Sequence, residues 1–308
     1  MLWAGSGVHP TIKLTLCGTD PKACSESCQL SSINNKKGLV MKKQTFSKLL
    51  QKNNPVILEI GACTGEDSLE FLREFSDIQL HCFEPDPRSV KIHQNTVKDA
   101  RCQLHPIAIS DVDGEAEFYQ STNNETETPE WLQSEWLQSS SLKPPKNHLE
   151  LYPWCKFENT VKVPTRSLDS WFAEQDIDQI DLIWADVQGA EENLIKGALK
   201  TLSHTKYFYT EYDDQEIYEG QITLQQIKAL LPKFKAIGLF YNNVLFKNTE
   251  IPDSALNTTD QILWQTWELF PAKVWLQFLT RSLKSKVDSL KGKAKATLKQ
   301  KFRQIFLD

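Results

Sequence analysis

The sequence lacks several features that would assign it to a class at once. No apolar run approaches the ~20 residues that a membrane-spanning helix needs. The N-terminus lacks the basic and then apolar pattern of a secretory signal peptide, so we expect a cytoplasmic protein. Seven cysteines are an odd number in such a chain, which argues against a disulfide framework. Cys24 and Cys28 have a spacing that zinc sites use, but no nearby second pair completes four ligands, so we expect no metal site.

Acidic residues outnumber basic residues in most of the chain, whereas basic residues are in excess at its end. The formal net charge is -5. From Arg281 onward there are nine cations and two acids, a net charge of +7, so the remainder carries -12. An acidic body disfavours a nucleic-acid substrate, because phosphate binding needs basic surface. The basic end favours an anionic partner such as the inner surface of a membrane.

Apolar runs of strand length alternate with segments of helical periodicity between residues 44 and 250. The predicted strands are Pro55–Ile60, Ile78–Phe83, Cys102–Ser110, Val161–Val163, Asp181–Asp186, Lys206–Tyr212, Phe234–Phe240 and Val244–Asn248. The predicted helices are Gln44–Leu50, Glu66–Phe75, Pro87–Val97, Leu168–Gln175, Glu191–Leu202 and Thr223–Leu231. Such alternation predicts an α/β fold with a doubly wound, Rossmann-like sheet and a terminal antiparallel hairpin.

Three further segments surround or interrupt this body. Residues 1–43 have no clear periodicity and are predicted to be a poorly organised extension, with the translation start left open between Met1 and Met41. Residues 120–160 form a long insertion with three tryptophans, preceded by a predicted hairpin turn at Asp111–Gly114. Residues 251–308 are predicted to be a linker and a basic amphipathic helix, which either packs, pairs with a partner or lies on an anionic membrane.

Acidic side chains recur where the predicted parallel strands end. They are Glu59, Glu84, Asp111, Asp186 and Glu211. Open α/β sheets bind ligands at the carboxyl ends of their strands. Five acids at one edge predict a binding site, because each buried carboxylate costs free energy unless a partner uses it.

The glycine turn after the first strand discriminates between cofactors. It reads E-x-G-x-x-x-G from Glu59 through Gly61 to Gly65, and it fails the G-x-G-x-x-G pattern of dinucleotide sites. The lysine of a phosphate-binding P-loop is also absent. Glu84 follows Gly65 by 19 residues, where an acid can accept both ribose hydroxyls. A ligand with a ribose, no phosphate and a cationic amino-acid end fits this edge, and S-adenosyl-L-methionine has that description.

Six ordered segments together resemble the FkbM family of class I S-adenosylmethionine-dependent methyltransferases. They are EIGACTG at 59–65, FEPDP at 83–87, AISDVDGEAEF at 108–118, SSSL at 139–142, VPTRSLDSW at 163–171 and DVQGAE at 186–191. The resemblance covers roughly residues 52–250, within the predicted domain at 44–250. It implies a seven-stranded Rossmann-like sheet and O-methylation, often of a sugar hydroxyl on a carbohydrate or glycolipid.

The resemblance also implies roles for particular residues. The cofactor-binding set would be Glu59, Gly61, Ala62, Thr64, Gly65, Glu84, Pro85, Ser110 and Asp111. Among these, Glu84 would bind the ribose, and Ser110 and Asp111 would lie near the adenine. The family usually has Asn at the position of Cys63 and Glu at the position of Gln188.

Methyl transfer to a hydroxyl needs a group that positions the acceptor oxygen and helps to remove its proton. We expect Asp186 to be this group, with Glu211 as the second candidate and Glu191 as a weaker third. For Glu191 we favour a structural role as a first-turn acid that the helix dipole stabilises. The alternative for the whole chain is an inactive methyltransferase fold that binds a membrane or partner through its basic tail.

Overall fold

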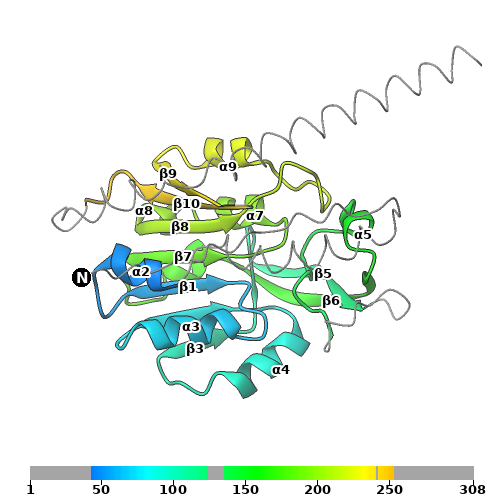
Figure 1. Cartoon of the computed structure of the whole chain (residues 1–308), viewed down its shortest axis with the longest axis horizontal. Helices are drawn as coiled ribbons and strands as arrows, with labels where there is room; N and C mark the ends of the chain where they lie inside the picture. Colours follow the sequence, from blue (N-terminus) through cyan, green and yellow to red (C-terminus); the bar gives the residue numbers. More distant parts are fainter. Residues whose placement is uncertain (1–42, 124–134, 241, 253–308) are drawn as a thin grey trace, which may run out of the picture. The chain divides into compact units, whose positions relative to one another are not determined.

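A computed structural model describes residues 43–123, 135–240 and 242–252 of the chain. A seven-stranded sheet dominates this region, with the strand order β3-β2-β1-β7-β8-β10-β9 (Figure 1). Its strands are β1 (Val56–Ile60), β2 (Gln79–Phe83), β3 (Cys102–His105), β7 (Ile180–Ala185), β8 (Thr205–Glu211), β9 (Phe234–Leu239) and β10 (Asn243–Asn248). The first five run parallel, and β9 and β10 form the predicted antiparallel hairpin. The predicted Rossmann-like fold is therefore confirmed.

The central strands of this sheet are buried on both faces, as their continuous apolar sequences predict. Every residue of β7 is buried. Trp184 on β7 stacks on Tyr209 of β8 with ring centroids 4.1 Å apart, and Phe46 packs edge-on against Trp184. Each such aromatic side chain stabilises the fold by about 1.5–3 kcal/mol through burial alone. The edge of the sheet where these strands end is thereby held rigid.

Helices connect the strands and have the local sequence signals that helices require. They are α2 (Lys43–Leu50), α3 (Glu66–Glu74), α4 (Pro87–Thr96), α6 (Leu168–Phe172), α7 (Glu191–Lys196), α8 (Leu199–Ser203) and α9 (Leu224–Leu230). At α4, Asp86 accepts a hydrogen bond from the Arg88 N–H and Pro87 occupies the first turn. At α9, Thr223 and Gln226 form a reciprocal capping box.

The prediction of one helix from Glu191 to Leu202 is wrong, because Gly197 separates α7 from α8. A Cβ atom at Gly197 would lie 1.9 Å from the carbonyl oxygen of Ser110. The backbone of residues 110–111 therefore presses directly on this position, and a regular helix with side chains on every face does not fit there.

A second, three-stranded sheet has the order β4-β6-β5 and was not predicted. It consists of β4 (Ala108–Ser110), β5 (Gly114–Asn123) and β6 (Cys155–Ser167). The predicted strand Cys102–Ser110 is wrong as one element, because Pro106 has no N–H for a sheet ladder and the chain leaves the large sheet there. Residues 111–113 do bend, but β6 lies between β4 and β5, so they do not form the predicted hairpin.

The two ends of the insertion at 120–160 belong to this second sheet. The first part of it extends β5 to Asn123, and the last part begins β6 at Cys155. The described part between them contains the short helix α5 (His148–Leu151). Two isolated bridges connect this part to the rest of the fold: Ser141 pairs with Tyr119 of β5, and Pro145 pairs with Tyr218 in the loop after β8. Residues 124–134 of the insertion, which include its first tryptophan, Trp131, lie outside the described residues.

The two terminal predictions fall almost entirely outside the described residues. These are the poorly organised extension at 1–43 and the basic amphipathic helix within 251–308, and both stay predictions. Within the part of the chain that the structure describes, no helix is long and apolar enough to cross a membrane.

We predict that Gly197→Ala lowers the free energy of unfolding by about 1–3 kcal/mol, because the added methyl group must displace the backbone at Ser110. Urea unfolding followed by circular dichroism measures this. Leu199→Ala, at an exposed position in the next helix, is the matched control and should change stability by less than about 0.5 kcal/mol. Equal stability of the two variants would contradict the proposed close contact.

Candidate active site

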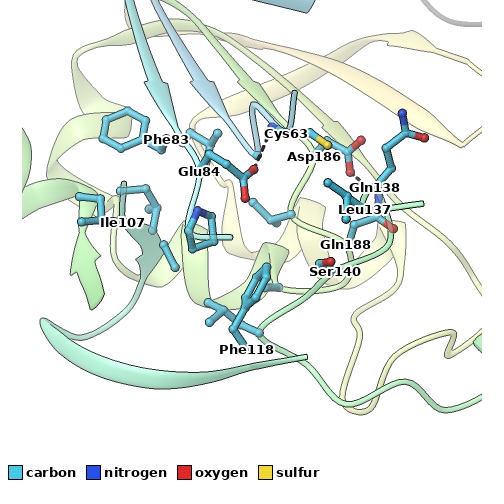
Figure 2. Close-up of a pocket in the computed structure, with 18 residues that line it drawn as sticks. Cys63, Phe83, Glu84, Ile107, Phe118, Leu137, Gln138, Ser140, Asp186 and Gln188 are labelled. Carbon is cyan, nitrogen blue, oxygen red and sulfur yellow. Dashed lines mark hydrogen bonds between the residues drawn. The ribbon is translucent and has the colours of Figure 1, made fainter. Parts of the chain in front are cut away.

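A cleft of about 640 Å3, open to solvent, lies where β1, β2 and β7 end (Figure 2). Its residues come from these three strand ends, from the second sheet and from the insertion. They are Ile60, Gly61, Cys63, Phe83, Glu84, Pro85, Ile107, Ala108, Ile109, Phe118, Leu137, Gln138, Ser140, Leu142, Asp186, Val187, Gln188 and Ala190. The strand order reverses between β1 and β7, which is where open α/β sheets bind ligands.

The charges in the cleft are of one sign. Glu84 and Asp186 line it, and no lysine, arginine or histidine is among the described residues that do so. The remaining lining is mostly apolar and includes Phe118, Leu137 and Leu142. Such a cleft suits a ligand with a cationic end and a flat apolar part.

The glycine turn after β1 packs directly against the end of β7. Gly61 has φ +89°, and a Cβ atom there would lie 1.9 Å from the carbonyl oxygen of Asp186. Only glycine combines this backbone conformation with such close contact. Cys63 also has a positive φ, +45°, which is strained for a residue with a side chain and is frequent at functional sites.

Glu84 is held at the floor of the cleft by backbone donors. Its Oε2 accepts the Cys63 N–H at 2.8 Å (Figure 2), and its Oε1 accepts the Asp86 N–H at 2.7 Å. Burial raises the pKa of this carboxyl to about 7, against the lowering effect of the two N–H donors. Each oxygen retains a further lone pair, so the carboxylate can accept ribose hydroxyls in addition.

Most of the other predicted cofactor residues lie beside the cleft and do not line it. Pro85 and Gly61 line it, whereas Ala62, Thr64 and Gly65 complete the turn behind them. Glu59 is buried under α3, where its Oε2 accepts a 2.6 Å hydrogen bond from Ser68, so its contribution to the cleft is indirect.

Ser110 and Asp111 also lie away from the cleft. Asp111 accepts a hydrogen bond from the Asn193 side chain of α7 at 2.8 Å. The three residues before Ser110, Ile107 to Ile109, line the cleft in their place. The adenine contact predicted for Ser110 and Asp111 stays a prediction, and these apolar residues are further candidates for it.

The two predicted catalytic carboxyls are joined by one amide group. Nε2 of Gln188 donates to Oδ1 of Asp186 at 2.5 Å and to Oε2 of Glu211 at 3.2 Å. Because both acceptors are carboxyl oxygens, the orientation of this amide is unambiguous. Asp186 and Glu211 are thereby held together beside the glycine turn, although Asp186 alone of the two lines the cleft.

Gln188 is itself fixed by segments that are distant in sequence. Its backbone oxygen accepts a 2.6 Å hydrogen bond from Ser141 of the insertion. The Tyr218 hydroxyl lies 3.0 Å from Oε1 of Gln188 and 2.8 Å from the backbone oxygen of Ser139. Tyr218 has one hydroxyl proton and can donate it to either oxygen. Gln188 has φ +48°, a strained conformation for a residue with a side chain. Tyr218 carries no signal in the sequence, because its role depends on how two loops meet.

The electrostatics of Asp186 suit proton transfer near neutral pH. Burial raises the pKa of Asp186 to about 6, and the hydrogen bonds from Gln188 and with Glu211 oppose that rise. Glu191 is also buried, and burial raises its pKa to about 7, but its carboxyl accepts the Gly189 N–H at the start of α7. This arrangement supports the structural role expected for Glu191.

The Rossmann-like sheet has a glycine turn after its first strand and an acid at the end of its second. A further carboxyl lies where the strand order reverses. Together these features define a class I methyltransferase. Comparison with known proteins identifies the family. The family model described as "Methyltransferase FkbM domain" matches residues 59–242, and the chain belongs to this family. It is thus a methyltransferase, and S-adenosyl-L-methionine is its methyl donor.

One relative is similar to this chain over most of the relative's own length. A protein of Sinorhizobium fredii (strain NBRC 101917 / NGR234), named 2-O-methyltransferase NoeI, is 43% identical over 208 residues, which are 66% of this chain and 83% of that protein. Solved structures are more distant. A putative O-methyltransferase from Klebsiella pneumoniae is 15% identical, with a TM-score of 0.37 over 76% of this chain and 92% of that one. The plantazolicin methyltransferase BpumL with S-adenosylhomocysteine is 12% identical, with a TM-score of 0.38 over 75% and 91%.

We predict that Glu84→Gln weakens binding of S-adenosylmethionine by about 10-fold to 100-fold, since a hydrogen bond to a charged group contributes about 1.5–3 kcal/mol. Isothermal titration calorimetry measures the affinity. Glu115→Gln, at an exposed position on β5, removes the same charge outside the cleft and should bind the cofactor like the unaltered protein. If Glu84→Gln binds equally well, Glu84 does not hold the ribose.

Proposed function

We propose that the enzyme transfers the methyl group of S-adenosylmethionine to a sugar hydroxyl of a carbohydrate or glycolipid. The observation that carries this proposal is the carboxyl pair of Asp186 and Glu211, bridged by Gln188 beside the glycine turn. The name of the Sinorhizobium fredii relative, a 2-O-methyltransferase, supports an oxygen atom as the acceptor.

The cleft suggests how the cofactor lies. Glu84 would accept the ribose hydroxyls of the cofactor, and the apolar side chains of Ile107, Ile109 and Phe118 would pack against its adenine ring. The glycine turn and the acidic end of β7 would hold its positively charged methionine part. Asp186 and Gln188 would then be the residues nearest to the methyl group.

The reaction is an in-line displacement at the methyl carbon. A lone pair of the acceptor oxygen forms the new C–O bond while the C–S bond breaks, and the sulfonium becomes a neutral thioether. Asp186 accepts the proton that the hydroxyl loses, so the products are a methyl ether, S-adenosylhomocysteine and a protonated carboxyl. A base with a pKa near 6 is largely ionised at neutral pH and still basic enough to assist.

Gln188 and Glu211 support this base in different ways. The Gln188 amide fixes the direction of the Asp186 carboxylate, which orients its remaining lone pairs towards the acceptor. Glu211 is the second partner of the amide and can take up a proton from Asp186, because two carboxyls so close favour sharing one proton.

We predict that Asp186→Asn lowers turnover by about 10²-fold to 10⁴-fold, the usual contribution of a positioned base. Cofactor affinity should fall much less than turnover, because the amide keeps the shape of the side chain and Glu84 still gives the cleft a negative charge. Turnover is measured with labelled S-adenosylmethionine and a glycan acceptor, and affinity by calorimetry. Asp176→Asn, at an exposed position, is the matched control. Turnover of Asp186→Asn at the control's level would remove Asp186 from the mechanism.

The pH dependence of kcat at saturating cofactor and acceptor should show an acid limb near pH 6, because protonation of Asp186 removes the base. Gln188→Glu replaces the bridging amide by a third carboxyl, whose negative charge raises the pKa of its neighbours. We therefore predict that the acid limb of this variant moves to higher pH while activity persists on the alkaline side. An unchanged acid limb would show that Gln188 does not control the charge of the base.

For the basic C-terminal region, we propose contact with an anionic membrane surface by an otherwise cytoplasmic enzyme. Nine cations against two acids from Arg281 onward support this. Deletion of residues 272–308 should abolish co-sedimentation with vesicles that contain phosphatidylserine. Vesicles of neutral phosphatidylcholine are the control. Undiminished binding by the truncated protein would leave packing or oligomerisation as the role of this region.

A further inference from the structure

A group of metal-ligating side chains lies outside the cleft, between α4 and the edge of the large sheet. Cys82 of β2, His93 of α4 and Cys102 of β3 each offer one ligand atom, and these three atoms lie within 4.8 Å of one another. Cys82 and His93 are buried, and Cys102 is partly exposed. Neither the catalytic proposal nor the cofactor site uses any of the three.

The fold itself brings these residues together. Cys102 is opposite Leu80 in the parallel pairing of β2 with β3, and Cys82 follows Leu80 by two residues. Side chains two residues apart on a strand share a face, so both thiols point to the same side of the sheet. Their sulfur atoms are 3.4 Å apart. Helix α4 connects these two strands and buries His93 against them.

A fourth donor is adjacent. Glu59 of β1 is directly opposite Cys82, and its Oε2 lies 3.3 Å from the Cys82 sulfur. Ser68 of α3 lies between the carboxyl and the imidazole, with its Oγ 2.6 Å from Glu59 and 3.0 Å from Nε2 of His93. Two thiols and an imidazole thus converge from three elements, and the carboxyl of Glu59 lies beside them, next to the Cys82 sulfur.

We propose that Cys82, His93 and Cys102 bind a zinc ion, with Glu59 as the fourth ligand. Thiolate sulfur and imidazole nitrogen are the donors that zinc prefers in closed tetrahedral sites. Around such an ion, neighbouring ligand atoms are about 3.5–3.8 Å apart. The sulfur atoms already have nearly this separation, so binding needs only small side-chain movements and the displacement of the Ser68 hydroxyl.

The charges of the site can be balanced. Binding releases one proton from each thiol to solvent, and the two thiolates then neutralise the doubly charged ion. The additional negative charge of Glu59 faces the buried Lys43, which also pairs with Asp67 at 2.9 Å. Cys102 is partly exposed and lies on the edge strand β3, so an ion can reach the site from solvent past this residue.

A bound ion would stabilise the glycine turn after β1. A Cβ atom at Gly65 would lie 2.9 Å from the His93 ring, so the ring packs directly under this turn. Glu84, the proposed ribose ligand, follows Cys82 by two residues. An ion that links β1, β2, β3 and α4 would therefore fix the positions of both. This role is structural and does not depend on the identity of the methyl acceptor.

Cobalt(II) is the probe that tests the proposal, because thiolate ligation gives a near-ultraviolet charge-transfer band and tetrahedral geometry gives visible bands. The full-length protein is treated with a chelator, kept reduced and titrated with the metal. We expect one cobalt ion per chain with both sets of bands, displacement by zinc, and a higher Tm when zinc is present.

Variants locate the site. Cys102→Ser and His93→Gln should lose the cobalt bands and the rise in Tm. Cys155→Ser, which removes a buried cysteine of the second sheet, should retain them. The double variant Cys24→Ser/Cys28→Ser should also retain them, which excludes the N-terminal cysteines as ligands. Circular dichroism verifies that each variant is folded.

Three results would overturn the proposal. The first is absence of stoichiometric cobalt binding by the folded, reduced, unaltered protein, which would leave the cluster as a hydrogen-bonded pair of neutral thiols. The second is loss of the bands in the Cys24→Ser/Cys28→Ser protein. The third is their survival in Cys102→Ser. If Cys102→Ser does not fold, the stoichiometry of the unaltered protein and the N-terminal double variant still decide the question.

Discussion

The close approach of the glycine turn to the end of β7 is the constraint on which the site depends. The carbonyl oxygen of Asp186 occupies the space that any side chain at Gly61 would need. The Asp186 N–H donates to the Ile60 oxygen at 2.9 Å, and the Gly61 N–H donates to the Phe83 oxygen at the same distance. Three strand ends are thus joined at one point, so the cofactor turn, the ribose acid and the catalytic carboxyl have fixed separations.

Buried acids surround this point, and their electrostatics explain what the site binds. Glu84 and Asp186 are both made less acidic by burial, and each is hydrogen-bonded to neutral donors. A carboxylate that lacks a cationic partner favours a ligand that brings a positive charge. The sulfonium and ammonium groups of S-adenosylmethionine bring two. Transfer of the methyl group removes the sulfonium charge, which weakens the attraction once the reaction is complete.

The central strands and the glycine turn could be predicted because their signals are local: apolar runs, helix caps and glycine spacing. The second sheet could not, since β5 and β6 pair Asn123 with Cys155 across an insertion without periodicity. The position of Ser110 and Asp111 outside the cleft could not be predicted, because the break at Pro106 divides one apolar run of the sequence into β3 and β4, which belong to different sheets. The bridging role of Gln188 needed Tyr218 and Ser141, which only the tertiary fold brings to it.

A crystal structure with S-adenosylhomocysteine and a sugar acceptor would test the proposed site, because it places the reacting atoms against the named residues. We expect ribose hydroxyls within hydrogen-bond distance of Glu84, adenine against Ile109 and Phe118, and an acceptor hydroxyl between the cofactor sulfur and the Asp186 carboxylate. A cofactor bound elsewhere, or an acceptor oxygen beyond the reach of Asp186 and Glu211, would contradict it.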